Sequence, residues 1–196
     1  MPYVELRAHT AFSFGDGAIT PEALVARAAE LGYEAIGITD TADLGGVVRA
    51  KVAADERGIK LIVGTELRVD GRPMAFLARD IDGCRKLASL VTHARVGSIE
   101  SWSPTNRQRG RGIPSVAWSY VAENAEGLHL LTGPASGTLA QFVREGRRED
   151  AERTLHKWRE AFSGRIAVEV QRHRGCGDES ALAGALVDIA NRASTP

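Results

Sequence analysis

Six polar residues could do chemistry together, because each one follows or ends a short apolar run of the sequence. They are Arg7, His9, Asp16, Asp40, Thr41 and Glu66. Imidazole and carboxylate groups are suitable ligands for divalent cations such as Zn²⁺, Mn²⁺ and Mg²⁺. If the fold brings these residues together, the set predicts either a metal cluster or a cleft that holds a phosphate group.

Alternating strands and helices are predicted to position these residues. Apolar runs with turn residues at their ends predict six strands: Tyr3–Leu6, Ala35–Thr39, Leu61–Val69, Met74–Ala78, Leu128–Thr132 and Ile166–Val170. Segments with helical periodicity lie between them: a helix opened by Thr20 and Pro21, then Leu44–Arg57, Ile81–Arg95, Ser115–Glu123, a helix from about Thr138, Glu149–Phe162 and Glu179–Arg192. Asp70 and Gly71 predict a tight turn that joins the third and fourth strands as a hairpin.

This alternation predicts an α/β fold with a mainly parallel sheet, either open or curled into a barrel. Such sheets collect ligand-binding groups at the carboxyl ends of their strands. The six polar residues are therefore expected on one rim of the sheet, with Arg7, Asp40 and Thr41 lining the cleft.

Four segments carry a resemblance to a known family: LRAHTAFSFGDG, IVGTEL, AEGLHLLTGPASGTL and IAVEVQRHRGCGDE. They resemble the PHP (polymerase and histidinol phosphatase) domain, as found at the N-terminus of bacterial DNA polymerase III alpha subunits and above all of their error-prone branch. The resemblance implies a distorted (β/α) barrel of seven strands. It also implies a cluster of His, Asp and Glu side chains that holds metal ions for the hydrolysis of phosphate esters.

Several ligand positions of the family are changed in this chain. The His-x-His pair is Arg7-Ala8-His9, and the Thr-Asp-His motif is Thr39-Asp40-Thr41. Two further ligand positions are occupied by Pro73 and Pro134, which have no coordinating group in their side chains. The resemblance thus leaves His9, Asp16 and Glu66 as the remaining ligands of a vestigial site. A final Asp-x-His pair is expected beyond Pro196, so residues 1–196 are interpreted as a PHP-like domain, an incomplete barrel, that is truncated at its C-terminal end.

Arg7 offers a replacement for the lost metal charge. A guanidinium keeps its proton in proteins and would repel a divalent cation beside it. We therefore expect Arg7 to pair with Asp16 or Glu66, and no cofactor to be needed. A divalent metal (Zn, Mn or Mg) bound by His9, Asp16 and Glu66 is the alternative. A barrel that lacks its last strands is also expected to be marginally stable or to associate, because it leaves a strand edge unpaired.

Residues 97–114 interrupt the pattern and are predicted to form an irregular basic loop. The segment is rich in Gly, Ser, Pro and Arg and contains Trp102 together with Arg107, Arg109 and Arg111. The main interpretation is a solvated connector. In the alternative, its arginines contact a nucleic acid backbone.

Composition excludes several classes of protein. The chain has 196 residues, of which 43% are hydrophobic and 26% charged, and its 25 basic residues balance 25 acidic ones. This is the composition of a globular protein rather than of a strongly basic nucleic-acid binder. There is no apolar run long enough to span a membrane, no secretory signal and no cysteine framework, which predicts a cytoplasmic protein. A chain of this length has no room for a polymerase site.

The leading functional prediction is a degenerate, non-hydrolytic PHP domain of an error-prone, DNA polymerase III alpha-like protein in replication or repair. Its role would be structural, with the polymerase module or another replication protein as partner. One alternative is a metal-dependent phosphoesterase or 3′–5′ exonuclease that uses His9, Asp16 and Glu66. The other alternative is a small domain that binds DNA through its arginine loop.

Overall fold

The computed structural model describes residues 3–100, 114–172 and 179–196. Its elements follow one another as β1 (Glu5–Ala8), α1 (Pro21–Glu30), β2 (Ala35–Ile38), α2 (Val47–Arg57), β3 (Lys60–Val69), β4 (Arg72–Ala78), α3 (Ile81–Glu100), β5 (Ser115–Val116), α4 (Trp118–Glu123), β6 (Leu128–Leu131), α5 (Thr138–Arg144), α6 (Arg148–Ala161), β7 (Ile166–Ala167) and α7 (Glu179–Arg192). Among the described residues no helix is long and apolar enough to cross a membrane.

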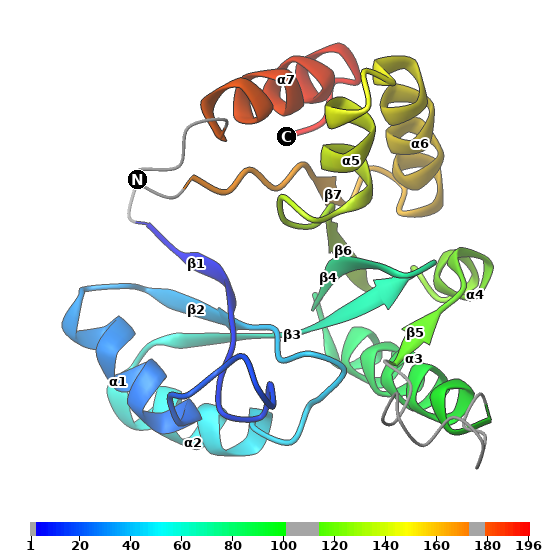
Figure 1. The fold of residues 1–196 in the computed structure, drawn as a ribbon. Coiled ribbons are helices and arrows are strands. Elements are labelled where there is room, and N and C mark those ends of the chain that lie inside the picture. Colours follow the sequence, from blue (N-terminus) through cyan, green and yellow to red (C-terminus); the bar gives the residue numbers. More distant parts are fainter. Residues whose placement is uncertain (1–2, 101–113, 173–178) are drawn as a thin grey trace.

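One curled sheet organises the chain, with the strand order β1-β2-β3-β4-β6-β7 and with β5 paired to β3 (Figure 1). The pairs β1–β2, β2–β3, β3–β5 and β6–β7 are parallel, whereas β3–β4 and β4–β6 are antiparallel. The α/β class and the incomplete barrel predicted from the sequence are thus confirmed, and the sheet is mixed with mainly parallel pairs.

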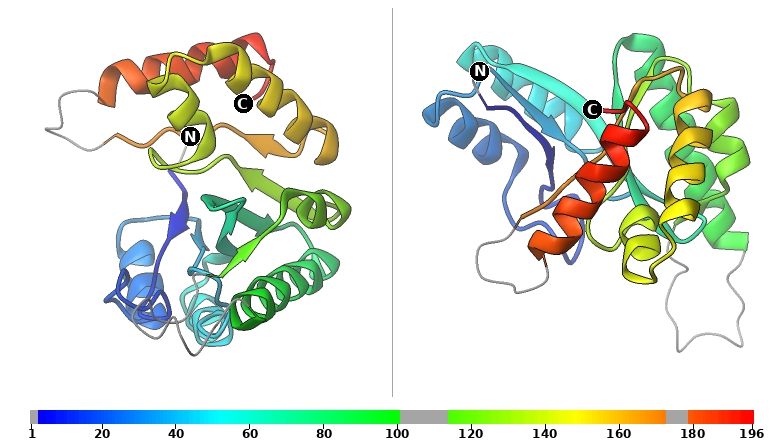
Figure 2. Two further views of the ribbon diagram at one scale, coloured as in Figure 1. Left: turned by 45° about the vertical axis from the view of Figure 1, so that its right-hand side comes forward. Right: turned by 90° about the horizontal axis from the view of Figure 1, so that it is seen from above.

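The long strand β3 joins the two parts of the sheet. Its first residues, Lys60–Val63, pair with β2, and the residues from Gly64 to Val69 pair with β4. Helices α1 and α2 lie beside the first part, and α3 to α7 surround the second (Figures 1 and 2). Each part has its own apolar core, one around Val25, Ile36 and Ile38 and a larger one around Phe76, Leu130 and Phe162.

Local sequence signals set several element boundaries as predicted. The Thr20 hydroxyl accepts a hydrogen bond from the Ala23 amide at 3.3 Å, which caps the start of α1. Asp70 and Gly71 both have positive φ, 48° and 83°, in the tight turn that joins β3 to β4.

Several predicted boundaries are wrong. The helix α2 begins at Val47 rather than Leu44, and β7 ends at Ala167 rather than Val170. The first strand is Glu5–Ala8, so it begins and ends two residues later than expected. Ser115 and Val116 do not start a helix but form β5, because they pair with the end of β3. The helix α3 continues through Glu100, so the irregular segment predicted for 97–114 does not begin at residue 97. Residues 101–113 of that segment lie outside the described part of the chain.

Candidate functional site

The carboxyl ends of β1, β2 and β3 meet at one edge of the sheet, because these strands run parallel. Arg7 lies in β1, and His9 is the first residue after that strand. Glu66 lies in β3, and its backbone forms an isolated β-bridge with Thr41, which follows β2. Parallel pairing therefore brings Arg7, His9 and Glu66 together, as the sequence predicted.

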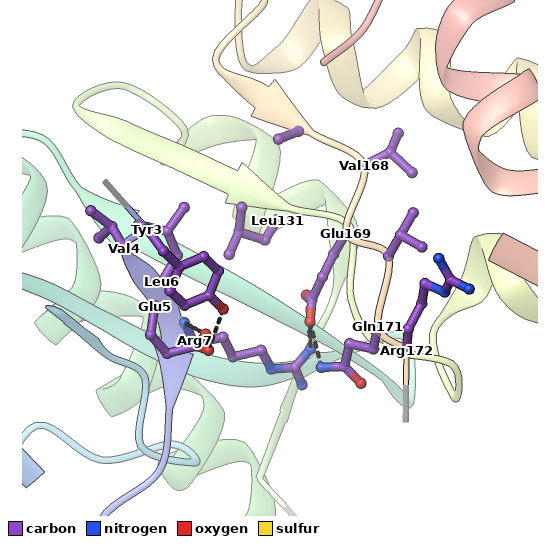
Figure 3. Close-up of a pocket in the computed structure, with 12 residues that line it drawn as sticks. Tyr3, Val4, Glu5, Leu6, Arg7, Leu131, Val168, Glu169, Gln171 and Arg172 are labelled. Carbon is purple, nitrogen blue, oxygen red and sulfur yellow. Dashed lines mark hydrogen bonds and ion pairs between the residues drawn. The ribbon is translucent and has the colours of Figure 1, made fainter. Parts of the chain in front are cut away.

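Arg7 is the centre of an ion-pair cluster. Its Nη2 atom forms a close ion pair with Glu66. Its Nη1 atom donates to both carboxylate oxygens of Glu169, each at 2.8 Å, and Gln171 Nε2 donates to Glu169 Oε1 at 2.7 Å (Figure 3). The three charged side chains are only 10%, 13% and 11% exposed for Arg7, Glu66 and Glu169. One guanidinium thus pairs with two nearly buried carboxylates and balances the charge of one of them.

The Arg7–Glu169 pair also connects the two ends of the sheet. Arg7 belongs to the first strand in the sheet order, and Glu169 follows β7, the last. A cavity of about 550 Å³ separates β1 from the segment 167–172, and Leu131 of β6 contributes to its lining (Figure 3). Within the described residues no strand pairing joins β1 to β7, so side chains make this connection.

His9 lies between two carboxylates. Its Nδ1 atom forms a close contact with Asp16, and its Nε2 atom lies 3.5 Å from Glu66 Oε2. The interactions with Glu66 and Asp16 raise the pKa of His9 and outweigh the opposing effect of burial. Burial alone would raise the pKa of Glu66, but His9 and Arg7 together lower it. These shifts favour an imidazolium between anions.

Asp40 holds the turn that precedes Asp16. Its carboxylate accepts hydrogen bonds from the Thr10 amide at 2.6 Å, the Thr10 hydroxyl at 2.7 Å and the Ser13 hydroxyl at 2.6 Å. Asp40 is only 2% exposed, so it lies beneath the rim that it was expected to line. Thr41 is exposed at the rim, and its amide donates to the Ser13 hydroxyl at 3.0 Å.

A second cavity of about 550 Å³ opens at the rim itself. Its lining includes Arg7, His9, Asp16, Pro134 and Gln171. Pro134 thus faces this cavity and offers it no coordinating atom. Pro73, in contrast, is a buried residue of β4 that is absent from this lining.

Glu169 is the site residue that the sequence reasoning missed. It stands alone among apolar neighbours in the run Ile166–Val170, and this isolation is the one signal that could have marked it. A lone carboxylate at the end of an apolar strand needs a partner. Nothing in the sequence shows that this partner is Arg7.

The fit of this arrangement to a divalent cation depends on its lone pairs and on its charges. A metal ligand must offer a lone pair. The Nδ1 atom of His9 contacts Asp16, whereas its buried Nε2 atom has no hydrogen-bond partner among the described residues. The two carboxylates nearest the centre are already paired with the guanidinium, which would repel a metal ion. Among the described residues no group of three or more His, Cys, Asp or Glu side chains is arranged to hold a metal.

Three predicted contact residues cannot be placed. Arg107, Arg109 and Arg111 lie outside the described residues, as does Trp102. A role of this segment in nucleic acid binding therefore stays a prediction from the sequence.

Comparison with known proteins gives one family match over most of the chain. The family model described as "PHP domain" matches residues 5–173. A putative metal-dependent phosphoesterase from Bifidobacterium adolescentis has a similar structure, with a TM-score of 0.61 and 19% sequence identity over 98% of this chain and 84% of that one. At this identity the likeness concerns the fold.

Curated relatives are DNA polymerases that are much longer than this chain. An error-prone DNA polymerase of Anaeromyxobacter sp. (strain K) is 40% identical over 184 residues, which is 91% of this chain and 15% of the relative. An error-prone DNA polymerase of Pseudomonas paraeruginosa is 35% identical over 99% of this chain and 17% of its own length. The DNA polymerase III subunit alpha of Pseudomonas aeruginosa is 31% identical over 99% of this chain and 16% of its own length. The chain thus spans about a sixth of these relatives.

Proposed function

Because the chain belongs to the PHP domain family, we propose that it is a non-hydrolytic PHP domain with a structural role in an error-prone, DNA polymerase III alpha-like protein. The observation that carries this proposal is Arg7, whose guanidinium pairs with both Glu66 and Glu169. A fixed cation in this position supplies positive charge where a metal ion would otherwise do so. In this proposal the guanidinium takes the place of an ion, and the site then lacks a Lewis acid that would polarise a phosphate or activate a water molecule.

The proposed partner is the polymerase module of the same kind of protein. The relatives named error-prone DNA polymerase and DNA polymerase III subunit alpha contain a region like this chain within a much longer polypeptide. The described structure has two apolar cores joined through β3. The Arg7–Glu169 ion pair connects the first and last strands across the open side of the sheet. These are properties of a scaffold, and they support a role in holding neighbouring parts of a replication or repair polymerase in place.

Metal analysis combined with a phosphoesterase assay tests the non-hydrolytic half of this proposal. The purified chain is incubated with Zn²⁺ or Mn²⁺, desalted, and assayed for bound metal and for hydrolysis of bis(p-nitrophenyl) phosphate. We expect substoichiometric metal, and turnover no higher than that of Glu66→Ala. Stoichiometric metal with turnover that Glu66→Ala abolishes, while the exposed control Glu30→Ala retains it, would contradict the proposal and establish the phosphoesterase alternative.

A domain exchange tests the structural half. In the Anaeromyxobacter sp. relative, the 184 aligned residues are either deleted or replaced by this chain. We expect the deletion to lower the melting temperature and DNA synthesis of the polymerase, and the replacement to restore both in part. A deletion that leaves melting temperature and DNA synthesis unchanged would refute the structural role.

A further inference from the structure

A third cavity lies at the end of the sheet opposite the Arg7 cluster. It has a volume of about 510 Å³ and opens where β1 and β3 begin and β4 ends. Its apolar lining includes Leu6, Ile62 and Leu77. A volume of this size and a largely apolar lining are typical of small-molecule sites.

Two exposed cations line this cavity. Lys60 and Arg79 are exposed residues of its lining. Within the described part of the chain, neither side chain makes a hydrogen bond or an ion pair, in contrast to the paired arginines of the Arg7 cluster and of α1. The acidic residue of the lining, Asp80, already accepts a hydrogen bond from the Gly83 amide at 2.8 Å at the start of α3. With two cations against one carboxylate, the lining carries a net positive charge.

His129 also lines the cavity and lies in the same positive environment. It lies in β6 beside Leu77 of β4. Burial lowers the pKa of His129, and the charges of Arg79 and Arg165 lower it further. A neutral imidazole keeps one N–H donor and one acceptor nitrogen, so it can hydrogen-bond to an anion without adding a third charge.

We propose that this cavity is a binding site for a small amphipathic carboxylate, which places its charged head between Lys60 and Arg79 and its apolar tail against Leu6 and Leu77. Nothing in the proposed structural role requires such a site. The two cations select an anion, because a carboxylate there replaces hydration with two charge-assisted contacts. The apolar part of the lining favours an alkyl tail, because burial of each methylene group contributes about 0.8 kcal/mol to the free energy of binding.

Titration with octanoate tests the site in the purified chain. Binding is followed by isothermal titration calorimetry and by two-dimensional NMR of the Ile62, Leu77 and His129 signals, below the concentration at which octanoate aggregates. Octanol, which has the tail without the charge, and acetate, which has the charge without the tail, are the matched ligands. We expect saturable octanoate binding and no comparable binding of either control.

Variants separate the head of the ligand from its tail. Lys60→Gln with Arg79→Gln is expected to weaken octanoate binding about tenfold, as the loss of two exposed charge contacts predicts. Leu6→Gln should weaken it as well. The double variant Arg27→Gln with Lys51→Gln, which removes cations from α1 and α2, is expected to bind like the parent chain.

Three outcomes would overturn the proposal. They are equal binding of octanol and octanoate, equal octanoate binding by the Lys60→Gln/Arg79→Gln variant, and no saturable binding by a chain whose NMR spectrum is that of a folded protein. The third outcome would also be expected if another polypeptide segment, rather than a small molecule, covers this cavity. Metal content and phosphoesterase activity do not enter this test, so its result is independent of the proposed function.

Discussion

Replacement of Arg7 by Met is the most informative single perturbation of this chain. It removes a guanidinium that is 10% exposed and leaves Glu66 and Glu169, which are 13% and 11% exposed, without a cationic partner. Breaking a buried pair by removing one partner costs about 3–5 kcal/mol. Because the cluster borders a cavity of about 550 Å³ and each side chain is partly exposed, we expect a loss near the lower value, about 3 kcal/mol of unfolding free energy.

Urea unfolding followed by tryptophan fluorescence measures this loss, since Trp118 and Trp158 are buried in the larger core. With a slope of about 2 kcal/mol/M, a loss of 3 kcal/mol lowers the midpoint by roughly 1.5 M. The control is Arg27→Met. It breaks an exposed pair with Glu30 at 3.0 Å, where the side chains are 62% and 63% exposed, so it should cost less than about 1 kcal/mol.

A triple variant distinguishes loss of charge compensation from loss of packing. Arg7→Met combined with Glu66→Gln and Glu169→Gln removes the unpaired carboxylates as well as the arginine. It should therefore be more stable than Arg7→Met alone, by about 1 kcal/mol or more. If Arg7→Met shifts the midpoint no more than the Arg27 control, or if the triple variant is as unstable as the single one, the ion-pair reasoning is refuted.

Three further predictions concern other parts of the structure. Asp40→Ala removes the acceptor of three hydrogen bonds and should lower the unfolding free energy by about 3 kcal/mol. The control Glu56→Ala removes an exposed carboxylate and should change the unfolding free energy by less than about 0.5 kcal/mol. Equal urea midpoints of the two variants would contradict this prediction. Gly133→Ala places a methyl group 2.2 Å from the Pro73 carbonyl at a φ of 100°, so its melting temperature should fall by several degrees, and an unchanged value would show that the chain relaxes there. For His129, the lowered pKa means that the unfolded chain takes up a proton first. The unfolding free energy should therefore fall as pH drops below about 6.5 and level off below the folded-state pKa, and His129→Gln should show a shallower fall between pH 7.5 and pH 5, roughly, in urea titrations.

Sequence reasoning succeeded where short-range signals decide the structure. Thr20 caps α1, and the Asp70-Gly71 turn joins β3 to β4, because both depend on residues within a few positions of one another. Parallel strands carry Arg7, His9 and Glu66 to one edge, and this could be predicted from the order of elements alone. The motifs of the family added the positions at which its usual ligands are replaced.

The same reasoning failed where a partner lies far along the chain. Ser115 and Val116 have no strong local preference, and they form a strand because Arg68 and Val69 offer a free edge. Glu169 was missed because its partner Arg7 lies 162 residues earlier. Asp40 was expected at the rim, but the donors of Thr10 and Ser13 draw its carboxylate into the interior.

The ion pair between Arg7 and Glu169 has a consequence for the rate of unfolding. It closes the longest loop among the interactions discussed for this site, and closing a loop of that size is entropically costly until most of the chain is already in place. The pair should thus form after the transition state for folding. Its loss would then accelerate unfolding and leave the folding rate nearly unchanged, so Arg7 sets how long the domain stays folded rather than how fast it folds.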